Sequence, residues 1–223
     1  MKSDQATRLE IPGAVSAGRR SRVLAVAGLV WLAVVTGGLA LMARYENSPG
    51  SVGSVPSVFL ATGATVRDPG VFTLVMMVHP RCPCSRASIG ELEKIMTRGR
   101  GRVTAQVLCY KPEGAADDWA QTDLWRSAGA IPGVRVVADE GGREAARFGG
   151  ETSGQTALFD GTGRLVFQGG ITAGRGHAGD NAGSDAVLAL VTGASLTKAA
   201  THVFGCPIQG RCDLPPNLKE PKS

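Results

Sequence analysis

Two cysteines separated by a single residue are the feature of this sequence with the clearest chemistry. Cys82 and Cys84 flank Pro83, shortly after an apolar run that ends at Val78. Because proline is favoured in the first turn of a helix, we expect Cys82 to be a helix N-cap and Cys84 to lie in the first turn. Unpaired backbone N–H groups and the helix dipole lower a thiol pKa there. The resulting thiolate attacks disulfides and binds soft metals, and a structural cysteine pair is the alternative.

Two histidines are candidate auxiliary residues. His79 precedes Cys82 by three residues. Protonated, it would stabilise the thiolate of Cys82, and neutral, it would be a metal ligand. His177 ends the glycine-rich stretch 172–177 and is a second candidate ligand. For both histidines the alternative is a side chain that simply faces water.

The remaining cysteines allow structural and redox interpretations. The chain has five cysteines, so at least one stays outside any set of intramolecular disulfides. Cys109 ends an apolar run and is expected in the core. Cys206 and Cys212 enclose a loop rich in turn residues, which favours a structural disulfide between them. In the alternative, Cys206 docks beside Cys82 and Cys84 and relays electrons.

An apolar segment near the N-terminus predicts a membrane anchor. Residues 23–42 contain no charged side chain, about the length that crosses a bilayer as a helix. Residues 1–22 carry five basic and two acidic side chains, so they are expected to stay in the cytoplasm. We therefore expect a single-pass signal anchor in a bacterial inner membrane, with the C-terminal domain on the periplasmic side. A cleaved signal peptide is the alternative.

Charge and composition set the domain plan. The basic N-terminus accounts for most of the formal net charge of +5, so no nucleic-acid surface is expected. Glycine, serine and proline after the anchor indicate a flexible stalk. The expected parts are a cytoplasmic segment (1–22), the anchor (23–43), the stalk (44–57), one domain (58–200) and a cysteine-containing extension (201–223).

Strand-like and helix-like patterns alternate within the domain. The expected strands cover 71–78, 103–109, 134–137, 156–159 and 164–168, and the expected helices cover 83–98, 117–128, 142–148 and 181–190, with Asp180 as the cap of the last. Such alternation predicts an α/β domain with a mostly parallel sheet covered by helices. The turn 160–163 adds an antiparallel hairpin, so the sheet is mixed.

These elements together resemble a membrane-anchored thioredoxin-like protein. The resemblance covers about residues 71–193 and rests on the strand, the cysteine pair and the later hairpin. A looser likeness to the bacterial RedB proteins rests on 79–84 and on 205–207. The resemblance to thioredoxin-like proteins implies a thioredoxin-like central mixed sheet flanked by helices.

Two departures from the thioredoxin pattern concern the site. The family usually has two residues between its cysteines, whereas only Pro83 stands here. A disulfide between Cys82 and Cys84 would therefore be strained and more oxidising or more easily exchanged. Gln155 stands where the family normally has a cis-proline, and its amide would alter substrate binding or leave the thiols open to a metal. An ordinary loop residue is the alternative for Gln155.

The sequence thus predicts a thiol–disulfide oxidoreductase without a cofactor, acting on protein thiols or disulfides. Cys82 would attack a partner disulfide and Cys84 would resolve the mixed disulfide. The second reading is copper handling, as in Sco-type proteins, with Cys82, Cys84 and His177 as the ligands. A third is a non-catalytic docking module with structural thiols.

Overall fold

The chain forms two compact units, residues 1–45 and 46–223. The computed structural model describes residues 17–62, 64–194 and 199–209. The first unit is dominated by helix α1 (Ala17–Glu46). Between Arg19 and Glu46 this helix contains an 18-residue stretch with a mean hydropathy of 2.3, and it is long and apolar enough to cross a membrane. It extends beyond the expected limits 23–43 at both ends, because charged residues at helix ends do not interrupt its backbone hydrogen bonding.

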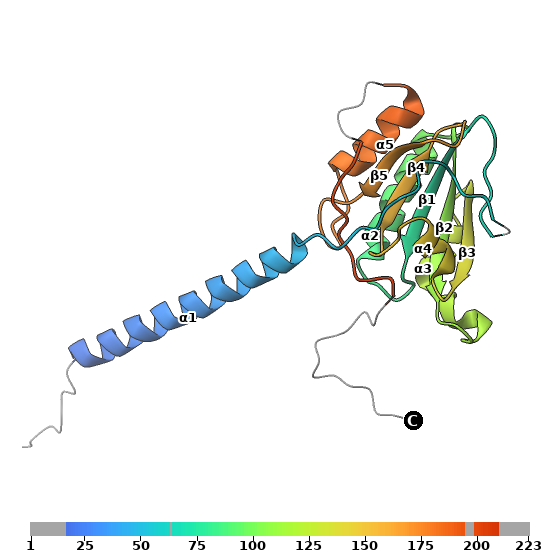
Figure 1. Cartoon of the computed structure of the whole chain (residues 1–223). Helices are drawn as coiled ribbons and strands as arrows, with labels where there is room; N and C mark the ends of the chain where they lie inside the picture. The colour runs from blue at the N-terminus through green and yellow to red at the C-terminus, as the bar shows by residue number, and fades with distance from the viewer. Residues whose placement is uncertain (1–16, 63, 195–198, 210–223) are drawn as a thin grey trace, which may run out of the picture. The chain divides into compact units, whose positions relative to one another are not determined.

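The second unit is built on a mixed five-stranded sheet (Figure 1) with the order β3-β2-β1-β4-β5. The pairs β1–β2 and β2–β3 are parallel, and β1–β4 and β4–β5 are antiparallel, which confirms the predicted mixed sheet. Its strands are β1 (Phe72–Val78), β2 (Val103–Lys111), β3 (Val134–Glu140), β4 (Gln155–Phe159) and β5 (Leu165–Gly170). The helical elements are α2 (Ser85–Arg98), the 3-10 helix η1 (Asp117–Ala120), α3 (Asp123–Gly129), α4 (Arg143–Arg147) and α5 (Ala182–Thr192).

Each face of the sheet has its own apolar core. Helices α2, α3 and α5 contribute to one core, and α4 and the segment before β1 contribute to the other. Alternate residues of β1 serve the two cores: Leu74 and Met76 face α2, and Val75 and Met77 face the opposite side. The burial of β1 on both faces explains why its sequence is a continuous apolar run.

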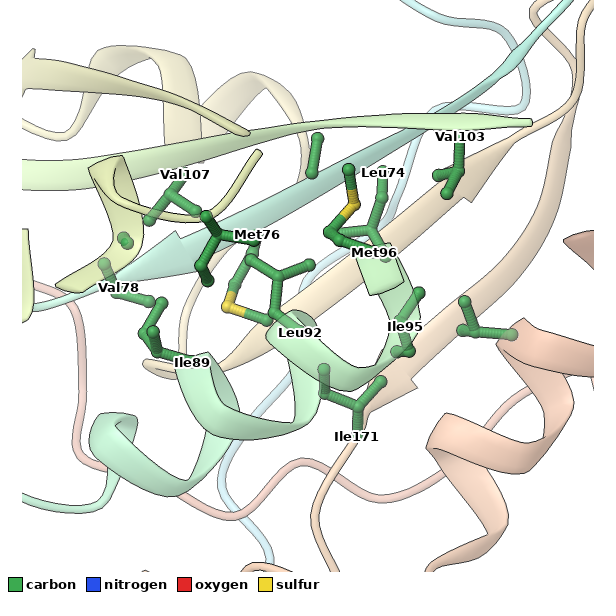
Figure 2. Close-up of a cluster of buried hydrophobic side chains, with 14 of the residues drawn as sticks. Leu74, Met76, Val78, Ile89, Leu92, Ile95, Met96, Val103, Val107 and Ile171 are labelled. Atoms are coloured by element: carbon green, nitrogen blue, oxygen red, sulfur yellow. The ribbon is translucent and has the colours of Figure 1, made fainter. Parts of the chain in front are cut away.

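Helix α2 is held on the sheet by one apolar stripe. Figure 2 shows Ile89, Leu92, Ile95 and Met96 pointing toward the strands, and all four are buried. Full burial of such a side chain contributes about 1.5–3 kcal/mol. The stripe therefore fixes α2 along β1, with the start of α2 close to the carboxyl end of that strand.

Three local differences from the sequence-based expectations have simple causes. Helix α2 begins at Ser85 with Cys84 as its N-cap, so the expected N-cap at Cys82 is wrong. The expected helix 117–128 is divided into η1 and α3, because the backbone of Thr122 is extended. Helix α5 is capped by Asn181 and not by Asp180, since the Asn181 side chain accepts two backbone N–H groups.

Residues expected to form a flexible stalk are hydrogen-bonded to the domain. The N–H groups of Gly50 and Gly53 donate to the carbonyls of Val203 and Gly149, at 2.8 and 3.0 Å. The N–H of Leu165 donates to the Ser57 carbonyl at 2.9 Å. From residue 50 onward, the expected stalk is therefore part of the folded unit. Within the expected extension (201–223), residues 210–223, including Cys212, lie outside the described residues.

Candidate functional site

Three cysteines meet at the start of α2. The sulfur atoms of Cys82, Cys84 and Cys206 all lie within 4.8 Å of one another. Cys82 is 2% exposed, whereas Cys84 and Cys206 are partly exposed. The structure therefore places the third cysteine beside the pair, as the relay interpretation requires. It also makes Cys84, and not Cys82, the member of the pair that faces solvent.

A turn between β1 and α2 explains why Cys82 points inward. The N–H of Cys82 donates to the His79 carbonyl at 3.0 Å, and the Cys82 carbonyl accepts from Ser85 N–H at 3.1 Å. The Pro80 carbonyl accepts from Thr122 Oγ1 at 3.0 Å, which ties this turn to the start of α3. These bonds use the backbone groups of the turn, so the helix starts two residues later than expected.

His79 is a buried, neutral histidine beside the thiols. It is 5% exposed, so the alternative of a water-facing side chain is wrong. Its ring stacks on Tyr110 with centroids 5.6 Å apart, and its Nδ1 accepts from the Arg81 N–H at 3.2 Å. Burial lowers the pKa of His79, and the negative charge of the nearby Cys82 only partly opposes this. The imidazole is therefore uncharged at neutral pH.

Ser153 connects the three segments of the site. This fully buried residue accepts from the His79 N–H at 2.7 Å through Oγ, and its Oγ lies 2.6 Å from the Ser85 Oγ. Its own N–H donates to the Cys206 carbonyl at 2.8 Å. The sequence analysis did not single out Ser153, because no local pattern marks a serine whose partners lie on distant segments.

The segment that carries Cys206 pairs with the residues before β4. Thr152 and Pro207 form an antiparallel bridge, and the Ile208 N–H donates to the Glu151 carbonyl at 2.9 Å. Ile208 is 1% exposed and packs into the core on the α4 side of the sheet. Cys206 is thus held in place from both sides of its backbone.

Gly205 permits the close approach of that segment. A Cβ at this position would lie 1.9 Å from the Ser153 carbonyl oxygen, so no larger residue fits without movement. The Gly205 carbonyl accepts a hydrogen bond from Arg175 Nη1. Arg175 comes from the glycine-rich loop before α5, which Glu91 of α2 holds by accepting the Gly179 N–H at 2.8 Å. No local sequence pattern marks Arg175, because its contact with Gly205 joins two segments that are 30 residues apart in the chain.

The ionisation of Cys84 is governed by its neighbours. Burial raises the pKa of Cys84, and the negative charge of Cys82 raises it further. The Arg175 guanidinium and a hydrogen bond with Cys206 act in the opposite direction. The expected lowering of the pKa at the helix start is therefore wrong for Cys84. Two adjacent thiolates repel each other, so the pair favours one negative charge.

Gln155 lies on the other face of the sheet from α2. It pairs with Met77 in the ladder, so its side chain shares the α4 face. Its Nε2 donates to the Gly149 carbonyl at 2.8 Å, and its Oε1 accepts the Glu151 N–H at 3.1 Å. These bonds hold the loop before β4 and do not bring the amide to the thiols. No peptide bond among the described residues is cis.

His177 and Cys109 lie apart from the sulfur cluster. The Nε2 of His177 is 3.9 Å from a carboxylate oxygen of Glu46, and among the described residues the grouped ligand atoms belong to the three cysteines alone. Cys109 is fully buried in the core, as predicted. Burial, assisted by the charge of Asp139, raises the pKa of Cys109 to about 12.

Solved structures share the fold of the second unit, although no protein-family model and no curated protein matches the chain. A hypothetical protein from Sinorhizobium meliloti 1021 is 20% identical, with a TM-score of 0.51, over 76% of this chain and 100% of its own. The fold is thioredoxin-like. Its central mixed sheet, flanking helices and N-terminal apolar helix agree with the sequence-based expectation.

Two further matches are more distant. A secreted disulfide oxidoreductase from Mycobacterium tuberculosis is 15% identical and has a TM-score of 0.42, over 56% of this chain and 83% of its own. The copper-bound ScoI of Arabidopsis thaliana is 14% identical and has a TM-score of 0.38, over 56% of this chain and 83% of its own.

Proposed function

We propose that this protein is a membrane-anchored, exported thiol–disulfide oxidoreductase. The observation that carries the proposal is the gathering of three sulfur atoms within 4.8 Å, two of which belong to partly exposed residues, Cys84 and Cys206. Exchange needs one sulfur that a partner can reach and a second one within reach of the first. This cluster meets both requirements, and its substrates are disulfides or thiols of other proteins.

Exposure favours Cys84 over Cys82 as the sulfur that meets the partner. The sequence pattern predicts this role for Cys82, but Cys82 is 2% exposed in the turn before α2. The thiolate of Cys84 attacks a partner disulfide, which gives a mixed disulfide and releases one partner thiolate. A neighbouring protein thiolate then attacks the Cys84 sulfur and releases the second partner thiolate. Run in reverse, the same steps oxidise a partner dithiol.

Helix α1 supports the exported location. Its length and hydropathy suit a single span, and the basic residues before it favour a cytoplasmic N-terminus. Disulfide chemistry belongs to oxidising compartments outside the cytoplasm. We therefore place the thioredoxin-like unit on the periplasmic side, tethered by α1. Protease added to intact spheroplasts should digest this unit, and protection from protease would contradict the topology.

The test of the activity uses the full chain in detergent and a small protein disulfide as substrate. Reduction of the substrate should disappear in Cys84→Ser, because the proposed attacking sulfur is lost. It should persist in Cys109→Ala, the matched control, since Cys109 is buried in the core. Full activity in Cys84→Ser, or no activity in the parent protein, would overturn the proposal.

The same cluster supports a second candidate, the binding of a soft metal such as Cu(I). Three thiolates suit Cu(I), and the sulfur atoms lie close enough to share one ion. The ligand set would be Cys82, Cys84 and Cys206, with Cys206 in place of the His177 expected from the sequence. Titration with Cu(I) against a competing chelator should show affinity lost in Cys206→Ser and unchanged in His177→Ala. If the parent shows neither exchange nor metal binding, a docking module with structural thiols is the supported function.

A further inference from the structure

We propose that Cys206 is the resolving cysteine of this protein, so that the disulfide formed during turnover joins Cys84 to Cys206 and not to Cys82. This inference rests on the proposed oxidoreductase function and goes beyond it, because it assigns the second sulfur of the exchange to a separate segment of the chain.

The first argument is that the position of Cys206 is built into the fold. Its carbonyl accepts the Ser153 N–H at 2.8 Å, and the Ile208 N–H is bonded to Glu151 at 2.9 Å. Val203 and Ile208, on either side of Cys206, are each 1% exposed. Because its neighbours are buried, Cys206 has a fixed position, and its sulfur stays close to those of Cys82 and Cys84.

The second argument is the manner in which this segment reaches the site. Residues 199–202 are hydrogen-bonded alongside the edge strand β5 in the parallel sense. Pro207 then forms an isolated antiparallel bridge with Thr152, before β4. Addition of an extended peptide to a sheet edge is a common mode of peptide recognition. The chain thus presents one of its own cysteines to Cys84 in the way that a partner peptide would, and the effective concentration is high because the contact is intramolecular.

The third argument is the geometry of the alternative bond. A disulfide between Cys82 and Cys84 must close across Pro83, whose ring fixes one backbone angle. The two residues also differ in exposure, since Cys82 is buried and Cys84 is partly exposed. Cys84 and Cys206 come from separate segments, so their bond is free of the constraint imposed by a one-residue spacer.

The reaction balances without a cofactor. The Cys84 thiolate attacks the partner disulfide R–S–S–R′, forms Cys84–S–S–R and releases R′–S⁻. The Cys206 thiolate then attacks the Cys84 sulfur, forms the Cys84–Cys206 disulfide and releases R–S⁻. Two electrons pass from the two protein thiols to the partner, and the protons lost by those thiols are available to R–S⁻ and R′–S⁻. An external dithiol reduces the protein disulfide and completes the cycle.

The first test maps disulfides in the full chain after oxidation in detergent. Digestion under non-reducing, acidic conditions and mass spectrometry should give a peptide that contains Cys84 linked to Cys206. A dominant Cys82–Cys84 bond, or a dominant Cys206–Cys212 bond, would overturn the inference. This map does not depend on turnover, so it can be interpreted even if the exchange activity is absent.

The second test measures the release step with an aromatic disulfide reagent whose thiolate is coloured. In Cys206→Ser the mixed disulfide at Cys84 should accumulate, and the second coloured thiolate should be released at least tenfold more slowly. In Cys82→Ser the second coloured thiolate should still be released, and faster than in Cys206→Ser. Unchanged release in Cys206→Ser, with slow release in Cys82→Ser, would make Cys82 the resolving residue. If the parent never forms the mixed disulfide, the proposed function itself fails, whatever the map shows.

Discussion

The sulfur atoms of Cys84 and Cys206 lie within 4.8 Å of each other, although the two residues come from opposite ends of the domain sequence. Burial and the negative charge of Cys82 raise the pKa of Cys84, and a hydrogen bond with Cys206 partly offsets this rise. Cys206 therefore acts on Cys84 in two ways: its sulfur is within reach for exchange, and its hydrogen bond alters the pKa of Cys84.

Replacement of Gly205 by alanine should detach the Cys206 segment from the site. The new Cβ would lie 1.9 Å from the Ser153 carbonyl oxygen, so the segment must move. We expect a loss of about 1–3 kcal/mol in the free energy of unfolding, as for other overpacked sites. Alkylation of Cys206 should become faster, and the yield of the Cys84–Cys206 disulfide should fall.

The matched control is Gly90→Ala in α2. A Cβ at Gly90 meets no atom within 4 Å, and alanine favours a helix over glycine by about 0.5–1 kcal/mol. The control should unfold at the same or a higher denaturant concentration and keep the parent pattern of disulfides. Equal disulfide yields in Gly205→Ala and Gly90→Ala would show that the close approach of Gly205 is not needed.

Removal of the Arg175 charge should make Cys84 less reactive. Its guanidinium lowers the pKa of Cys84, so Arg175→Gln should shift the alkylation profile of Cys84 to higher pH. One pKa unit is a tenfold change in the thiolate fraction, and we expect a loss of rate at neutral pH between about twofold and tenfold. Peptide mass spectrometry of the alkylated chain isolates Cys84 from the other thiols. Arg147→Gln, which removes an exposed partner of Glu144, should leave the profile unchanged.

Substitution of Gln155 distinguishes a structural role from a role in substrate binding. Gln155→Leu removes the acceptor of the Glu151 N–H and one donor to the Gly149 carbonyl, which keeps its bond from the Gly53 N–H. Loss of partners for such part-buried groups should cost about 1–3 kcal/mol in chemical denaturation. The alkylation profile of Cys84 should not move, because the amide lies on the α4 face. If the alkylation profile of Cys84 shifted while the stability stayed unchanged, Gln155 would have a role at the thiol site and not a structural one.

Cys109 should make the protein less stable at alkaline pH. Its folded-state pKa is raised to about 12, so the unfolded chain loses this proton at a lower pH than the folded protein does. The contribution is fully present below the unfolded-state pKa and is lost as the pH rises toward 12. Over that window, Cys109 should lower the free energy of unfolding by up to about 1.4 kcal/mol per pH unit. Cys109→Ala should have a correspondingly flatter pH profile, and parallel profiles would contradict the burial of the thiol.

Much of the fold could be predicted because its signals are local. A few neighbouring residues suffice to predict three elements: the apolar run ending at Val78, the helical stripe of α2 and the turn before β5. Element boundaries were less predictable. Helix α2 starts at Ser85 because the turn before it uses the backbone groups that a longer helix would need, and that turn depends on Thr122 from another element.

The sequence by itself determined the reactive thiol pair, the order of strands and helices, and the apolar N-terminal helix, since all three depend on residue type and spacing along the chain. The tertiary structure decided that Cys84 is the exposed member of the Cys82–Cys84 pair and that Cys206 completes the cluster. It also placed Gln155 away from the thiols. The physical reason is the same in each case: exposure and the meeting of distant segments depend on how the two faces of the sheet are covered, and no local pattern carries that information.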